Sequence, residues 1–118
     1  MKVLLMLVRL TFVVQLVLGI GLWTGHFLDF VGVHMGIGIV FVVALWALAI
    51  GALRSGGPKN AAWSVLLLGL VIAGFGSSQA KIMIGDMHWI VRAVHLLLAL
   101  GVMPLAERLA KGSGATTR

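Results

Sequence analysis

Four histidines are the side chains of this chain that could do chemistry, because few other polar groups interrupt its apolar segments. They are His26, His34, His88 and His95. An imidazole inside a membrane is costly to place, and there it commonly serves as a metal ligand, a proton carrier or a hydrogen-bonding partner between helices. The chain has no cysteine, which excludes disulfides, thiolate metal sites and covalently attached c-type haem.

Two of these histidines have a small residue one helical turn further along on the same helix face. Gly38 follows His34 at this spacing, and Ala99 follows His95. A flat macrocycle that stands between two helices needs such clearance beside its ligands. The pattern therefore favours a b-type haem whose iron is bound by the imidazoles of His34 and His95.

The polar residues nearest this pair could bind the haem carboxylates or serve as other iron ligands. Arg92 shares the helical stripe of His95 and either binds the haem carboxylates or extends to the membrane surface. His88 and His26 are second choices as iron ligands, and together they would allow a second haem. His88 is also an alternative partner for His34, because these two residues are expected at more similar depths in the membrane.

The composition predicts the elements that must position these residues. The chain is 61% hydrophobic, has a mean hydropathy of +1.15, and carries only 9 basic and 3 acidic side chains, which excludes a soluble globular domain. Apolar stretches long enough to cross a bilayer predict four helices in a single all-α domain, residues 1–110. These helices are expected at about residues 3–25, 30–53, 61–79 and 87–108, followed by a disordered cytoplasmic tail, 111–118.

The net charge of +6 is interpreted as a sign of membrane topology and not of nucleic-acid binding. The cations cluster at the ends of apolar segments and do not alternate with aromatic residues. Their distribution predicts an up-down-up-down bundle in a bacterial inner membrane with both termini in the cytoplasm. Asp29 is the expected N-cap of the second helix, and Asp86 that of the fourth.

Several of these residues together resemble one four-helix half of the haem A synthase family. They are Gln15 and Trp23-Thr24-Gly25 in the first segment, His34 near the start of the second, and His95-Leu-Leu-Leu-Ala99 in the fourth, beside a glycine-rich third segment. The resemblance covers about residues 10–108. It implies a haem between the second and fourth helices, with His34 and His95 as its axial ligands.

The chain departs from that family where the synthase reaction would need an acid. The family has a glutamate three residues before the histidine of the second helix, and this chain has Val31 there. The cysteine pair that bacterial members often carry in an outer loop is also missing. We therefore expect haem binding and single-electron transfer, as in a small membrane cytochrome b. A haem-modifying enzyme is an alternative.

Other classes of membrane protein are compared on the same residues. Small multidrug antiporters also have four helices, but they depend on a carboxylate in the first helix, where this chain has Gln15. We expect Gln15 to form a hydrogen bond between helices. The main alternative is an accessory or scaffold subunit, whose partner would be a larger respiratory or photosynthetic complex or a second copy of the chain.

Overall fold

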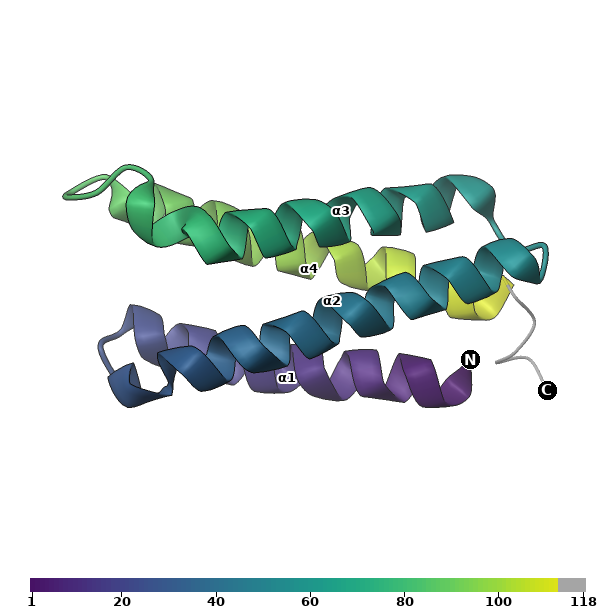
Figure 1. Cartoon of the computed structure of the whole chain (residues 1–118), viewed down its shortest axis with the longest axis horizontal. Coiled ribbons are helices and arrows are strands. Elements are labelled where there is room, and N and C mark those ends of the chain that lie inside the picture. Colours follow the sequence, from purple (N-terminus) through teal and green to yellow (C-terminus); the bar gives the residue numbers. More distant parts are fainter. Residues whose placement is uncertain (113–118) are drawn as a thin grey trace.

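The computed structural model describes residues 1–112, and in this range every regular element is helical (Figure 1). The elements are α1 (Lys2–Trp23), η1 (Leu28–Phe30), α2 (Val31–Arg54), α3 (Lys59–Ser78), η2 (Gln79–Lys81) and α4 (His88–Gly112), where η1 and η2 are short 3-10 helices. The prediction of an all-α chain with four long helices is confirmed.

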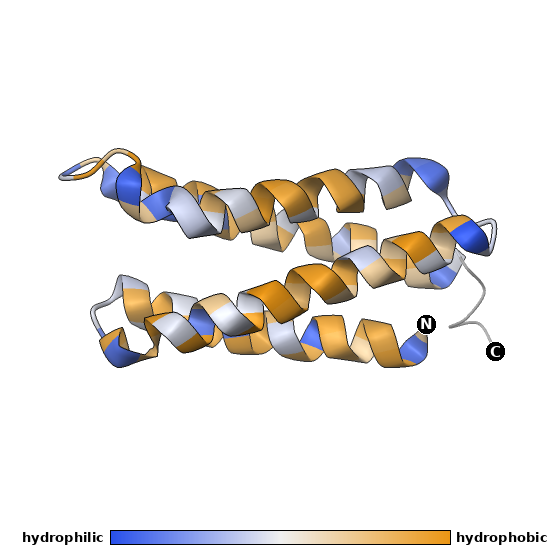
Figure 2. Ribbon diagram, in the orientation of Figure 1, coloured by the Kyte–Doolittle hydropathy of each residue, from blue (hydrophilic) through white to orange (hydrophobic). Residues whose placement is uncertain are grey.

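All four long helices of the described part are long and apolar enough to cross a membrane. Their mean hydropathy over the most apolar window is 2.4 for α1, 2.5 for the segment that includes α2, and 1.8 for both α3 and α4. The hydrophobic surface runs along the length of the bundle, and the hydrophilic residues gather mainly towards its two ends (Figure 2). Large apolar side chains such as Ile39, Leu67 and Leu97 are more than 60% exposed, as expected for residues that face lipid.

The start of α2 differs from the prediction that Asp29 caps this helix. Asp29 lies inside η1, and the N-cap position of α2 belongs to Phe30, which makes no side-chain cap. The physical reason is the turn that precedes η1. Phe27 adopts a left-handed conformation with φ of 57°, and its carbonyl accepts a 2.8 Å hydrogen bond from the Phe30 amide. A backbone carbonyl, and not the Asp29 side chain, therefore accepts a hydrogen bond from an amide at the start of the helix.

The other helix ends lie within a few residues of the expected positions. Asp86 lies in the turn before α4, which begins at His88. This helix continues to Gly112, past the expected end near residue 108, so Lys111 is helical although it was assigned to the tail. The remaining part of that predicted tail, residues 113–118, lies outside the described residues.

The long helices lie side by side, and their connections define two ends of the bundle (Figure 1). The α2–α3 connection lies at one end, together with the start of α1 and the last turn of α4; we call this the core end. The α1–α2 and α3–α4 connections lie at the opposite end, which we call the cavity end. In this view α2 runs obliquely from α1 at the cavity end towards α3 at the core end.

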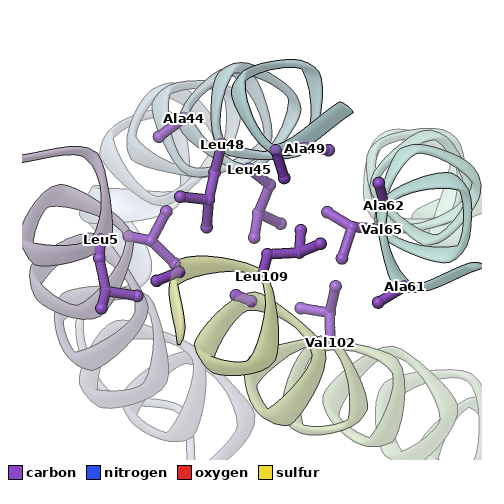
Figure 3. Packing of buried hydrophobic residues seen from close by; sticks show 14 of the residues in the cluster. Leu5, Ala44, Leu45, Leu48, Ala49, Ala61, Ala62, Val65, Val102 and Leu109 are labelled. Carbon is purple, nitrogen blue, oxygen red and sulfur yellow. The ribbon is translucent and has the colours of Figure 1, made fainter. Parts of the chain in front are cut away.

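The hydrophobic core occupies the half of the bundle nearer the core end. Buried side chains from all four long helices meet there, including Leu5 of α1, Leu45 and Leu48 of α2, Val65 of α3 and Leu109 of α4 (Figure 3). Buried alanines fill the contacts between them: Ala44, Ala49, Ala52, Ala61, Ala62, Ala106 and Ala110. Small residues let helices approach closely in a membrane, so this half is tightly packed.

Two polar contacts join helices beside this core. The indole Nε1 of Trp46 in α2 donates a 3.2 Å hydrogen bond to the carbonyl of Leu66 in α3. The guanidinium of Arg9 in α1 pairs with both carboxylate oxygens of Glu107 in α4, at 2.5 and 3.1 Å. These contacts connect α2 to α3 and α1 to α4.

Candidate functional site

A cavity of about 480 Å³ lies between the four long helices in the half of the bundle nearer the cavity end. This volume is in the range of ~300–1,000 Å³ typical of small-molecule and cofactor sites. Its apolar walls include Phe12, Phe41, Val42 and Ile72. Its polar or small lining residues include Gln15, Gly19, His34, Gly38, Gly76, His88, Arg92, His95 and Ala99.

The structure brings His34 of α2 and His95 of α4 to the same cavity. Both side chains are partly buried and belong to the lining of this cavity. The Nδ1 atom of each ring is buried and has no hydrogen-bond partner. A buried polar atom without a partner is costly, so the cavity presents two imidazoles that a ligand could satisfy.

Each of these imidazoles faces a glycine on a neighbouring helix. A Cβ added to Gly19 of α1 would lie 3.5 Å from Cε1 of His34, and one added to Gly76 of α3 would lie 2.9 Å from Cε1 of His95. The sequence reasoning named small residues on the histidines' own helices and missed these two. A Cβ at Gly76 would thus be too close to the His95 ring, whereas a Cβ at Gly19 would make an ordinary van der Waals contact with the His34 ring.

Aromatic packing further fixes the orientation of the His95 ring. The ring of Phe75, the residue before Gly76 in α3, stacks on His95 with an interplanar angle of 10° and a centroid distance of 6.2 Å. His95 therefore contacts α3 through both Phe75 and Gly76. This contact holds the imidazole in one position between α3 and α4.

Gln15 lies in the cavity wall, one turn before Gly19 on α1. Its Nε2 atom would be only 2.8 Å from a Cβ added to Gly38 of α2. The space that Gly38 leaves is therefore taken up by the Gln15 amide. Gln15 does not form the expected hydrogen bond between helices with any described residue, and its Oε1 atom is buried without a partner.

His88 and Arg92 line the same cavity from the first two turns of α4. Nδ1 of His88 donates a 3.1 Å hydrogen bond to the carbonyl of Ile82, since a carbonyl can only accept. Arg92 is exposed and makes no hydrogen bond or ion pair with the described part of the chain. Its guanidinium is thus available for an anionic group of a ligand.

His26 is the one histidine among residues 1–112 that does not line the cavity. It is exposed in the turn after α1, where its Nδ1 lies 2.9 Å from the hydroxyl oxygen of Thr24. This short contact gives the His26 ring a polar partner within its own turn. His26 therefore serves as a matched control for the three histidines of the cavity.

No protein-family model matches the chain, and neither does any curated protein or any solved structure.

The donor set decides which kind of metal centre these residues fit. Among residues 1–112 no group of three or more His, Cys, Asp or Glu side chains is placed to hold a metal ion. A protein-only metal site needs about four ligands, whereas haem iron needs only axial ligands such as imidazoles from the protein. The two unpartnered imidazoles, the apolar walls and the free guanidinium of Arg92 fit a haem better than a bare metal ion.

Proposed function

We propose that the chain is a small membrane cytochrome b that binds haem through His34 and His95 and transfers single electrons. One observation carries this proposal: imidazoles from two different helices line one cavity, and each keeps a buried nitrogen without a protein partner. His34 and His95 would hold the haem, and the bound haem would supply reversible one-electron chemistry.

The chain's own residues contribute position and environment to this chemistry. Phe75 and Gly76 hold the His95 imidazole, and Gly19 gives room to that of His34. Arg92 offers a charge-assisted partner for haem carboxylates. The apolar walls would surround a bound haem with mostly nonpolar side chains, and the polarity of its surroundings is one of the factors that set a haem potential.

We further infer an up-down-up-down bundle in a bacterial inner membrane, with both termini in the cytoplasm. The support is the charge distribution: Arg54 and Lys59 flank the α2–α3 connection, whereas only Lys81 and Arg92 lie near the α3–α4 connection together with Asp86. Basic residues favour the cytoplasmic side. The cavity would then lie in the outer half of the membrane, where electrons would enter and leave.

The resemblance to half of a haem A synthase supports haem binding but not the synthase reaction. Val31 occupies the position at which that family has a glutamate, and it lies in the wall of the cavity. An apolar side chain there offers no acid or base for the oxidation of a methyl group. We therefore assign electron transfer and leave haem modification out of the proposal.

The test is the haem content of the purified full chain and of four variants, in each of which one histidine is replaced by alanine. We expect a Soret band that shifts on reduction with dithionite. His34→Ala and His95→Ala should each lower the haem-to-protein ratio by about tenfold or more, because even changes outside the ligand shell cost ~10–100-fold in metal affinity. His26→Ala is the control and should keep the wild-type ratio.

Two results would contradict this assignment in different ways. A wild-type chain that is colourless and also fails to bind added haem would exclude the cytochrome and favour the scaffold subunit. If His88→Ala lost the haem while His34→Ala or His95→Ala retained it, the chain would still be a cytochrome, but the axial pair would be different.

A further inference from the structure

The core end carries an open groove that plays no part in the proposed haem site. Its volume is about 830 Å³, and it lies between the last turns of α4 and the α2–α3 connection. One wall is formed by Gly56, Gly57 and Pro58 of the connection, and the other by α4 residues that include Arg108 and Lys111. Because both walls end membrane-spanning helices, the groove lies at the level of the lipid headgroups.

Close backbone packing holds the two walls of the groove together. A Cβ added to Gly112 would lie only 2.5 Å from Cδ of Pro58, so the last turn of α4 lies directly against the connection. The connection itself is fixed by a 2.7 Å hydrogen bond from the Gly57 amide to the Ala52 carbonyl. Gly56 adopts a φ of +78°, a backbone conformation that residues with a side chain rarely adopt. The relative position of the two groove walls is therefore fixed by these backbone and side-chain contacts.

The groove is positively charged. Arg108 and Lys111 are both exposed along it. Glu107 is the one acidic side chain in its lining, and its two carboxylate oxygens are already paired with Arg9. Two cations therefore remain in the groove without an acidic partner from its lining, beside the apolar rings of Pro58 and Pro104.

We propose that this groove binds the headgroup of an anionic phospholipid. A phosphate between Arg108 and Lys111 would receive charge-assisted hydrogen bonds, and a guanidinium suits phosphate oxygens in a two-point contact. Basic pockets between helices at the membrane surface bind anionic headgroups in this way. The prolines and the apolar exterior of α4 offer surface for the first part of an acyl chain.

Native mass spectrometry of the full chain in detergent tests the proposal by counting bound lipids. The probes are phosphatidylglycerol, which is anionic, phosphatidylcholine, which is zwitterionic, and inorganic phosphate as a competitor. The variants are Arg108→Gln with Lys111→Gln, and the control Arg54→Gln with Lys59→Gln. The control removes the same charge at the same end of the bundle but outside the groove.

We expect the groove variant to bind phosphatidylglycerol about fivefold or more weakly, and the control to change by less than about twofold. Phosphatidylcholine binding should be the same in all three proteins. Lys111→Gln alone should weaken binding in the same direction, and all of the side chains changed are exposed, so the fold should persist.

Two results would overturn the lipid site. An equal loss in the groove variant and the control would show attraction to overall surface charge and no site. Displacement of phosphatidylglycerol by millimolar inorganic phosphate, with the same dependence on Arg108 and Lys111, would assign the groove to a free phosphate. Neither result bears on haem content, so the cytochrome proposal is tested separately.

Discussion

At the scale of single residues, two of the three cavity histidines, His34 and His95, each lie beside a glycine of a neighbouring helix. A Cβ at Gly76 would displace the His95 ring, whereas a Cβ at Gly19 would only make ordinary van der Waals contact with the His34 ring. His95 is the tighter of the two, because a Cβ at Gly76 would lie 2.9 Å from its ring, against 3.5 Å for Gly19 and His34. Gly76 therefore restricts the position of the His95 imidazole.

This leads to a prediction for Gly76→Ala. The added methyl group would come closer to the His95 ring than real side chains do, so the ring must move, and overpacking of this kind costs about 1–3 kcal/mol. We expect a clear drop in haem content, measured by the pyridine haemochrome spectrum. Gly74→Ala on the same helix is the control, because its Cβ would meet nothing within 4 Å. An identical haem content in the two variants would show that Gly76 does not position His95.

The sequence predicts the imidazoles of this site better than their surroundings. His34 and His95 could be named because polar residues are rare in these helices and spacing assigns them to a face. Gly19 and Gly76 could not, since the contact depends on how each helix is rotated about its axis, and the chain has 16 glycines to choose from. Gln15 stands out in the sequence as a polar residue. Its packing into the space beside Gly38 could not be predicted, because it also depends on how the two helices are rotated about their axes.

At the scale of elements, hydropathy predicts the helices and local chemistry predicts their ends less well. Each long helix begins and ends within a few residues of the expected bounds, because the length of an apolar run must match the membrane. The entry to α2 was predicted wrongly, since Asp29 suggested a cap and the chain instead forms η1 after the left-handed Phe27. Such a turn depends on backbone geometry that composition does not reveal.

The ion pair between Arg9 and Glu107 is an element-scale feature that the sequence analysis did not foresee. It joins α1 to α4, which are far apart in the sequence, through two contacts between the guanidinium and the carboxylate. The side chains are 47% and 32% exposed, so the pair is expected to be weak. The pair therefore joins α1 to α4 but contributes little to the stability of the bundle.

Charge reversal tests this role. Glu107→Arg should lower the midpoint of thermal unfolding in detergent by a few degrees at most, because it places like charges on α1 and α4. The double variant Arg9→Glu with Glu107→Arg restores opposite charges and should recover most of that loss, as followed by circular dichroism. Haem content should stay at the wild-type level, since neither residue lines the cavity. A double variant as unstable as the single one would count against a direct pairing.

At the scale of the whole molecule, tight packing and the cavity are separated along the bundle. The core cluster is built mainly from leucine, valine and alanine side chains of all four long helices (Figure 3), so the helices pack closely against each other there. The other half carries histidines, glycines and Gln15 around the cavity. A membrane bundle needs close contacts between helices for stability, and this division supplies them without filling the site.

The two ends should face opposite sides of the membrane, and this is testable because the sequence contains no cysteine. Ser55→Cys lies in the α2–α3 connection, and Lys81→Cys lies in η2 near the α3–α4 connection; both positions are exposed. In intact cells treated with a membrane-impermeant maleimide we expect labelling of Lys81→Cys alone, and of Ser55→Cys only after the membrane is opened, because basic residues favour the cytoplasmic side and would place the core end there. Labelling of both in intact cells would contradict the membrane-spanning arrangement. The opposite pattern would keep the bundle but turn the cavity towards the cytoplasm, and the electron partners would then be expected on that side.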